Sequence, residues 1–182
     1  MPQPIASRAR PSRPVLQAIA AIAFFLAGPA ALQADEVLPE PAGAVLLTVS
    51  GVAARSAGED VAKLDLAMLE ALPVTRFRTS TIWTEGVSEF TGVALGDLLT
   101  YLGAEGTRIE AVALNDYKVT IPFSDAVKEG PIVAYRMDGA LLKRRGKGPL
   151  WVVYPYDANP DYQTEVIYSR SIWQLDRIVV GE

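Results

Sequence analysis

The sequence predicts an α+β domain built on a mixed or antiparallel, mainly β sheet with short helices. Segments with strand character outnumber segments with helical periodicity. The helical segments fall between strands without the regular alternation that is typical of a doubly wound fold. The second half of the chain is especially rich in strand-like segments, and no internal repeat or coiled-coil heptad interrupts the pattern.

A strand, a helix and a second strand open the predicted domain. Residues 45–52 are apolar and rich in β-branched side chains, which predicts a strand. Residues 64–72 carry apolar side chains at helical spacing, Asp65 near the start suits the helix dipole, and Pro73 ends the helix. Residues 74–83, which are rich in Thr, Phe and Ile, predict the next strand.

Short elements separated by turns follow. A turn at 85–86 precedes an extended segment at 89–93. A helix over 95–102 ends at Gly103, which suits a left-handed C-cap. A further helical turn is expected over 124–129, closed by a Gly-Pro pair.

Two dipeptides predict turns between paired strands. Asn115-Asp116 is typical of a tight turn, and Asp138-Gly139 is the strongest short hairpin signal in the chain. The strands that they join are expected at 108–114 with 117–121, and at 132–137 with 140–143. The last three strands are expected at 150–154, 165–171 and 175–180.

The composition excludes several kinds of site, because the 182 residues include no cysteine and no histidine. A disulfide, a catalytic thiolate, a Cys/His zinc site, a histidine-ligated haem and a Ser-His-Asp triad are all excluded. Acid–base chemistry would have to use Asp, Glu, Tyr or Lys, and any metal site would need oxygen ligands.

Residues 1–34 are expected to be a secretory signal peptide. Arg8, Arg10 and Arg13 precede an apolar run at 15–26, and small residues then lead to a cleavage site after Ala34. The run is shorter than the roughly 18 apolar residues that a membrane span needs, so we expect a chain that does not span the membrane after cleavage. The arginines are not adjacent, which favours export of an unfolded chain to the periplasm or beyond.

The remaining chain is expected to comprise a leader at 35–44 and one domain at 45–182. Three of the 17 basic residues and none of the 21 acidic ones lie before Asp35, which leaves a net charge of −7. Such an acidic chain is not expected to bind nucleic acid.

Four sequence patches carry a family resemblance. They are Phe90-Thr91-Gly92-Val93-Ala94-Leu95 followed by Asp97-Leu98-Leu99, Ala134-Tyr135-Arg136-Met137-Asp138-Gly139, Gly148-Pro149-Leu150-Trp151-Val152-Val153-Tyr154-Pro155, and Trp173-Gln174-Leu175-Asp176-Arg177-Ile178-Val179-Val180. In this order, over about residues 45–180, they resemble the sulfite-oxidase type of molybdopterin-binding oxidoreductase domain. The resemblance implies the compact α+β core that holds molybdopterin in that family.

The sequence departs from the family at the position that carries the chemistry. In the family a cysteine thiolate ligates molybdenum, and in one branch it stands four residues ahead of a tryptophan. Counting back from Trp83 places Thr79 at that position, and Trp151 replaces a basic residue of the third patch. A threonine hydroxyl is a hard, barely acidic oxygen that does not substitute for a soft thiolate.

The residues around this position are the first candidate contacts. In a strand with period two, Thr79 shares a face with Phe77, which favours an inward orientation. Thr79 and Ser80 are therefore candidate pocket groups, although Thr79 is equally consistent with an ordinary strand residue. Trp83 either lines a pocket or caps the core.

Further candidates come from two loops and one strand. Asp116 and Tyr117 either contact a ligand or simply form a turn, and Arg136 lies in the second family patch. Arg144 and Arg145 belong to a basic cluster with Lys143 and Lys147. That cluster is either an anion site or a solvated loop. The tyrosines at 154, 156, 162 and 168 provide either a binding surface or the packing of a long loop.

Two functional hypotheses follow. The first is an exported, non-catalytic binding or sensory module without a cofactor. Its partner would be a small anionic ligand, or else a membrane sensor or redox protein. The second is an oxidoreductase that binds molybdopterin and holds the metal without a protein thiolate, which rests on analogy with the family.

Overall fold

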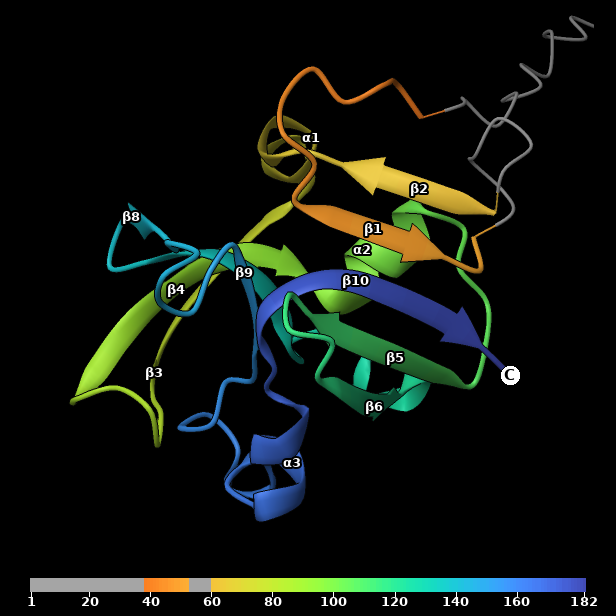
Figure 1. Cartoon of the computed structure of the whole chain (residues 1–182). Coiled ribbons are helices and arrows are strands. Elements are labelled where there is room, and N and C mark those ends of the chain that lie inside the picture. The colour runs from red at the N-terminus through yellow and green to blue at the C-terminus, as the bar shows by residue number, and fades with distance from the viewer. Residues whose placement is uncertain (1–37, 53–59) are drawn as a thin grey trace, which may run out of the picture. The chain divides into compact units, whose positions relative to one another are not determined.

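The structure is a computed structural model that describes residues 38–52 and 60–182. These residues contain ten strands, three α-helices and two short 3₁₀ helices (Figure 1). The strands are β1 Leu47–Ser50, β2 Val61–Leu64, β3 Val74–Ser80, β4 Val87–Ala94, β5 Arg108–Ala113, β6 Lys118–Pro122, β7 Ile132–Met137, β8 Ala140–Leu141, β9 Leu150–Val153 and β10 Trp173–Gly181. The helices are α1 Leu66–Ala71, α2 Leu95–Tyr101, α3 Glu165–Arg170, η1 Phe123–Asp125 and η2 Pro160–Tyr162.

The ten strands form one mixed sheet, which confirms the predicted α+β class. The main order is β2-β1-β10-β9-β7-β4-β3, with β5 and β6 attached through β10 and with β8 attached to β7. Strands β1 and β10 pair in parallel, and the other pairings within the described residues are antiparallel.

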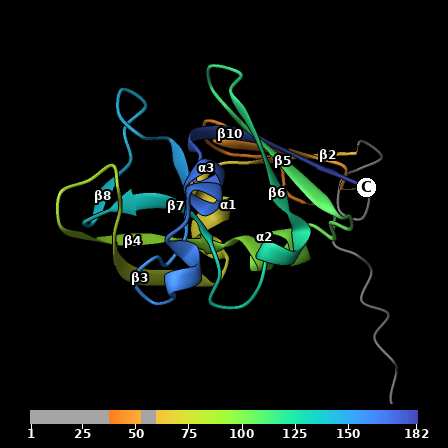
Figure 2. The ribbon, with the colours of Figure 1, turned by 90° about the horizontal axis from the view of Figure 1, so that it is seen from below.

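Strand β10 joins the two halves of this sheet. Its first residues, Trp173 and Leu175, pair with β9, whereas residues 177–179 pair with β1. Strand β5 pairs along β10 in the opposite direction, and Figures 1 and 2 show β10 beside β5 in both views. The β10–β9 register shifts around Gln174, whose backbone has a φ of 54°, and the β10–β5 register shifts between Leu175 and Arg177. The start of β10 is therefore a junction where several strands converge.

The predicted helices over 64–72 and 95–102 are confirmed as α1 and α2. Asp65 caps α1, since its carboxylate accepts a hydrogen bond from the Met68 amide at 2.9 Å. The same side chain accepts a second bond, at 2.7 Å, from the Gly43 amide, which holds the preceding segment. Gly103 follows α2 with a φ of 63°, the left-handed conformation expected for its C-cap position.

Both predicted turns are confirmed. Asp138 and Gly139 have φ values of 50° and 78° between β7 and β8, as a type I′ hairpin requires. Asp116 has a φ of 63° in the turn between β5 and β6, which pair antiparallel.

The predicted strand over 165–171 is wrong, because this segment is helix α3. The Thr164 hydroxyl accepts a hydrogen bond from the Ile167 amide at 3.3 Å, Glu165 lies in the first turn and Arg170 in the last. These capping and dipole interactions outweigh the strand preference of the β-branched and aromatic residues.

Three other expectations need smaller corrections. The helical turn expected over 124–129 is reduced to the 3₁₀ helix η1, because Ala126 already leaves helical geometry. The strand expected over 74–83 ends at Ser80. Strand β2 was not predicted, because its four residues are too short to show a period.

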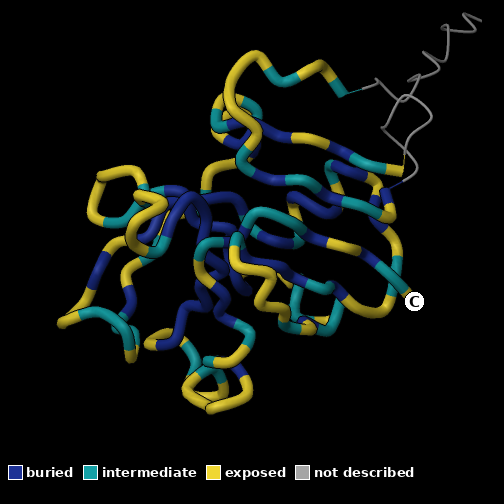
Figure 3. Tube along the Cα trace, viewed as in Figure 1, coloured by how far each residue is buried: buried dark blue, intermediate teal, exposed yellow. Residues whose placement is uncertain are grey.

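A continuous apolar core fills the fold, and its burial is drawn in Figure 3. Trp151 is its largest member, fully buried on β9, and its indole N–H donates to the Ser171 carbonyl at 3.2 Å. Its ring makes edge-to-face contacts with Phe90 at 5.3 Å and with Trp83 at 5.8 Å between centroids. A large aromatic side chain therefore occupies the position where the resemblance implied a basic residue.

The signal peptide expected at 1–34 lies outside the described residues, and the leader expected at 35–44 is described from Leu38 onward. No helix in the described ranges is long and apolar enough to cross a membrane.

Candidate functional site

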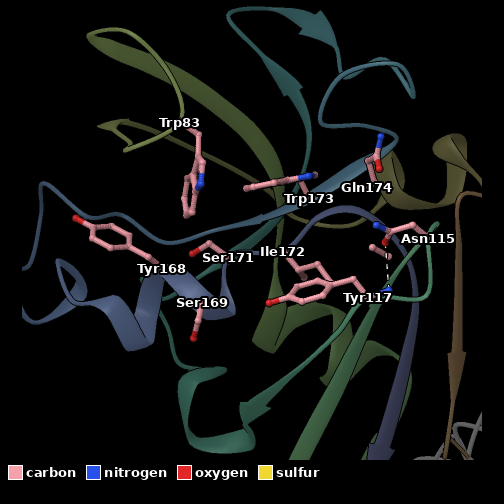
Figure 4. Close-up of a pocket in the computed structure, with 10 residues that line it drawn as sticks. Trp83, Asn115, Tyr117, Tyr168, Ser169, Ser171, Ile172, Trp173 and Gln174 are labelled. Atoms are coloured by element: carbon pink, nitrogen blue, oxygen red, sulfur yellow. Dashed lines mark hydrogen bonds between the residues drawn. The ribbon is translucent and has the colours of Figure 1, made fainter.

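A cavity of about 390 Å³ lies where β10 begins, and Figure 4 shows its walls. Four parts of the chain supply them: the loop after β3, the turn between β5 and β6, helix α3 and the start of β10. The lining residues are Trp83, Ala113, Asn115, Tyr117, Tyr168, Ser169, Ser171, Ile172, Trp173 and Gln174. The volume falls within the range of small-molecule sites.

Aromatic rings form the frame of this pocket. Trp83 stands edge-on to Trp173, with ring centroids 5.4 Å apart, and to Tyr168, with centroids 5.8 Å apart. Figure 4 places Tyr117 and Ile172 on the other side of the space from Trp83 and Trp173. Trp83 lines the pocket and also packs on the buried Trp151.

The polar groups of the pocket are neutral. The Asn115 side-chain oxygen accepts a hydrogen bond from the Tyr117 amide at 3.1 Å, which fixes the turn. The Gln174 side-chain amide donates to the carbonyls of Arg144 at 2.8 Å and Gly146 at 3.1 Å. Among the described residues that line the pocket, none is charged.

Lys147 is not one of the lining residues, but it brings a positive charge next to this neutral pocket because it lies over Trp173, which lines it. Its ammonium lies 4.2 Å from the ring centroid of Trp173 and 5.0 Å from that of Trp151. Both contacts have cation–π geometry. Partial burial lowers the pKa of Lys147 below its usual value. The main-chain carbonyl of Lys147 accepts a hydrogen bond at 2.9 Å from the main-chain N–H of Gln174. This bond anchors the basic loop to the pocket wall.

Thr79 lies outside the pocket lining, in a clasp with Ser80 and Asp157. Its side chain is fully buried, and its hydroxyl accepts a hydrogen bond from the Asp157 amide at 3.0 Å and donates to the Ser80 carbonyl at 3.3 Å. The inward orientation predicted from the strand period is what the structure shows.

Asp157 closes the clasp from the other side. Its two carboxylate oxygens accept hydrogen bonds from the Ser80 amide and the Ser80 hydroxyl, each at 2.6 Å. These hydrogen bonds hold the pKa of Asp157 below its ordinary range, and the bond from the Ser80 hydroxyl is the largest cause. Thr79 and Ser80 thus tie the end of β3 to the loop after β9.

The other predicted contacts are dispersed. Asp116 forms an ion pair with Arg177 at 2.6 Å, and this hydrogen bond lowers the Asp116 pKa. Arg136 forms an ion pair with Glu70 at 2.7 Å and lines a separate, open groove. Arg144 and Arg145 lie in the exposed loop between β8 and β9.

Of the eight candidate contacts, the structure therefore brings Trp83 and Tyr117 together in the pocket. Sequence reasoning missed Trp173 and Gln174, which also line it. The available signal was that both residues stand at the start of the fourth family-like patch, Trp173–Val180.

The predicted tyrosine surface divides in two. Tyr154 and Tyr156 are packing residues, fully buried, with hydroxyls that donate to Asp125 at 2.8 Å and to Ser171 at 2.6 Å. Burial is the main cause that raises the pKa of Tyr156 to about 12, so its hydroxyl stays protonated at neutral pH. Tyr168, by contrast, reaches the pocket wall.

Comparison with known proteins adds one finding. A family model described as the oxidoreductase molybdopterin binding domain matches residues 63–158, which is more than half of the chain. The match includes Trp83, Asn115, Tyr117 and Lys147, whereas the pocket wall from α3 and β10 follows it in the chain. No curated protein matches the sequence.

Proposed function

The chain belongs to the oxidoreductase molybdopterin-binding domain family, and we propose that it is an exported, non-catalytic member that binds a small anionic ligand. The ligand site in this proposal is the pocket framed by Trp83, Tyr117 and Trp173. The observation that carries the proposal is the burial and main-chain hydrogen bonding of Thr79, the residue that the family resemblance aligns with the metal-ligating cysteine.

Thr79 serves the fold in a way that leaves no ligand for a metal. The full sequence offers no thiol, and the Thr79 hydroxyl is fully buried with both of its hydrogen bonds directed to the main chain. Within residues 38–52 and 60–182, no group of three His, Cys, Asp or Glu side chains is placed to hold a metal ion. The donor set therefore does not fit the metal of the family's cofactor.

The pocket residues support binding rather than bond making. The aromatic rings offer apolar faces, the Asn115 turn offers a neutral amide, and Lys147 supplies a positive charge at the rim. Tyr156 is held protonated, and the Asp157 carboxylate is engaged in the clasp, so neither is suited to proton transfer in the pocket.

The alternative is a molybdopterin-dependent oxidoreductase that holds its metal without a protein thiolate, and family membership favours it. In that case the protein would carry molybdenum after purification. A membrane sensor as partner accords with the binding module, and a redox subunit accords with the enzyme.

Metal and pterin analysis separates the two functions. The full chain is produced in a host that makes molybdenum cofactor, purified from the compartment to which it is delivered, and analysed by mass spectrometry for molybdenum and pterin. We expect molybdenum far below one atom per chain. Near-stoichiometric molybdenum together with a pterin would overturn the binding module and establish the alternative.

A further inference from the structure

We infer that the pocket selects a planar aromatic ring that carries an anionic group, with the ring held by Trp173 and Tyr117 and the anion by Lys147. This inference rests on the proposed function and gives the ligand a chemical class. Its three supports are the exposed aromatic walls, the unpaired charge of Lys147 and the absence of acidic side chains from the described lining.

The walls favour a flat ring. Tyr117 is 56% exposed and Trp173 is 37% exposed. The neighbouring core residue Trp151, by contrast, is completely buried. Their apolar surfaces gain free energy when a ligand removes them from water. Rings stack or meet edge to face at about 4.5–7 Å between centroids. In Figure 4 Trp173 borders the pocket on one side, and Tyr117 together with Ile172 borders it on the other, so a ligand meets apolar surface on two sides.

The rim favours an anion. Lys147 is half-buried over two indole rings, and no carboxylate in the described part of the chain forms an ion pair with it. A partly desolvated ammonium without a counter-ion is stabilised by an anion that reaches it. Lys143, Arg144 and Arg145 of the same loop add to the positive potential.

The lining also selects against cations. Aromatic pockets bind ammonium ligands through cation–π attraction to the faces of their rings. Here the Lys147 ammonium already lies over the ring of Trp173. The lining residues supply no carboxylate to neutralise a cation. A positively charged ligand would therefore meet a like charge at the rim.

Matched ligands test each half of the inference by isothermal titration calorimetry on the purified full chain. Indole-3-acetate carries ring and anion, indole-3-acetamide is nearly the same shape without the charge, tryptamine carries a cation, and acetate lacks the ring. We expect indole-3-acetate to bind about tenfold tighter than indole-3-acetamide, the ratio for one charge-assisted contact. We expect tryptamine and acetate to bind more weakly than either.

Variants assign the contacts. Lys147→Gln should reduce the ratio between indole-3-acetate and indole-3-acetamide to near one, because it removes the charge and keeps the chain length. Trp173→Ala should weaken both ligands. Lys63→Gln, which removes a charge from strand β2 away from the pocket, is the matched control and should leave the ratio unchanged.

Several results would overturn the inference. Equal affinity for indole-3-acetate and indole-3-acetamide would show that the pocket does not select the anionic group. Acetate that binds as tightly as indole-3-acetate would show that the pocket does not select the ring. Tightest binding of tryptamine reverses the charge preference, and no binding of any of the four up to about 1 mM rejects the class. These results test the class of ligand, whereas the molybdenum content tests whether the protein is non-catalytic, so the two failures can be told apart.

Discussion

At the residue scale, the environment of Thr79 is the feature on which the two proposed functions differ. Because the sequence contains no cysteine, Thr79→Cys places a single thiol at the candidate metal-ligand position. The side chain there is fully buried, so a thiol reagent reaches it only through local opening of the clasp. We expect a disulfide reagent such as dithionitrobenzoate to label this variant at least about 100-fold more slowly than an exposed thiol.

Ile82→Cys is the matched control, since Ile82 lies three residues along the chain and is 62% exposed. The rates are measured for both variants by absorbance, first in native buffer and then in denaturant, where they should become equal. Equal rates in native buffer would show that position 79 opens to a solvent-filled cavity, and that result would favour the metal-holding alternative.

Asp157 gives the clasp a pH dependence. Its pKa is lower in the folded chain than in the unfolded chain, so its contribution to stability is present above the unfolded pKa of about 3.9 and is lost as the pH falls through the folded pKa. Because the carboxylate is exposed, solvent screening limits its contribution to no more than about 1 kcal/mol.

We therefore expect Asp157→Asn to lower the free energy of unfolding at pH 7 and to leave a smaller difference from the original chain at pH 3. Urea unfolding at pH 7, 5 and 3 measures this change. Glu105→Gln removes an exposed carboxylate outside the clasp and is the control. A constant difference between Asp157→Asn and the original chain at all three values would contradict the role given to Asp157.

At the element scale, the sequence predicted elements well where turn chemistry specified them. Asp138-Gly139 fixed the β7–β8 hairpin, and Gly103 marked the end of α2. Segment 165–170 was mispredicted because its β-branched and aromatic side chains have strand preference, whereas the Thr164 cap and the packing of Tyr168 on Trp83 select a helix. That packing is a contact between distant segments, which local patterns do not contain.

Gly92 allows β4 to approach β7 closely, because it carries no Cβ. A Cβ at this position would lie against the Val133 carbonyl oxygen and 2.6 Å from the Ala134 Cα. Both are backbone atoms, so no change of side-chain rotamer can relieve the clash. We expect Gly92→Ala to lower the free energy of unfolding by about 3 kcal/mol, the upper part of the range for an overpacked interior. Chemical denaturation followed by tryptophan fluorescence measures the change.

Gly146→Ala provides the comparison, since the nearest atom to its Cβ, the Lys143 carbonyl oxygen, would lie at an ordinary 3.5 Å. This substitution should alter stability by no more than about 0.5 kcal/mol. Similar losses for the two variants would show that the β4–β7 pair relaxes around an added methyl group.

At the scale of the whole molecule, the site is formed by the sheet topology. Trp83 was a candidate because of its spacing from Thr79, and Tyr117 because it adjoins the Asn115-Asp116 turn, yet no local pattern showed that Trp173 would lie beside them. The pairing of β10 with both β9 and β5 brings that residue to the loop after β3 and to the turn after β5. Arg136 could equally have been a ligand contact on sequence grounds, and the same topology places it beside Glu70 instead.

The proposed export also concerns the molecule as a whole, because the fold must then form outside the cytoplasm. The basic start, the apolar run at 15–26 and the small residues before Ala34 predict that the product begins at Asp35 and carries a net charge of −7. Expression of the full chain in a Gram-negative host, followed by fractionation and intact-mass measurement, tests this prediction. We expect the periplasmic species to lack residues 1–34. Ile22→Arg, which places a charge in the apolar run, should leave the unprocessed 19.6 kDa chain in the cytoplasm, because a charged residue disrupts the apolar segment that the export machinery binds. An unprocessed chain that stays in the cytoplasm without the substitution would contradict export, and the fold would then form where molybdenum cofactor is made.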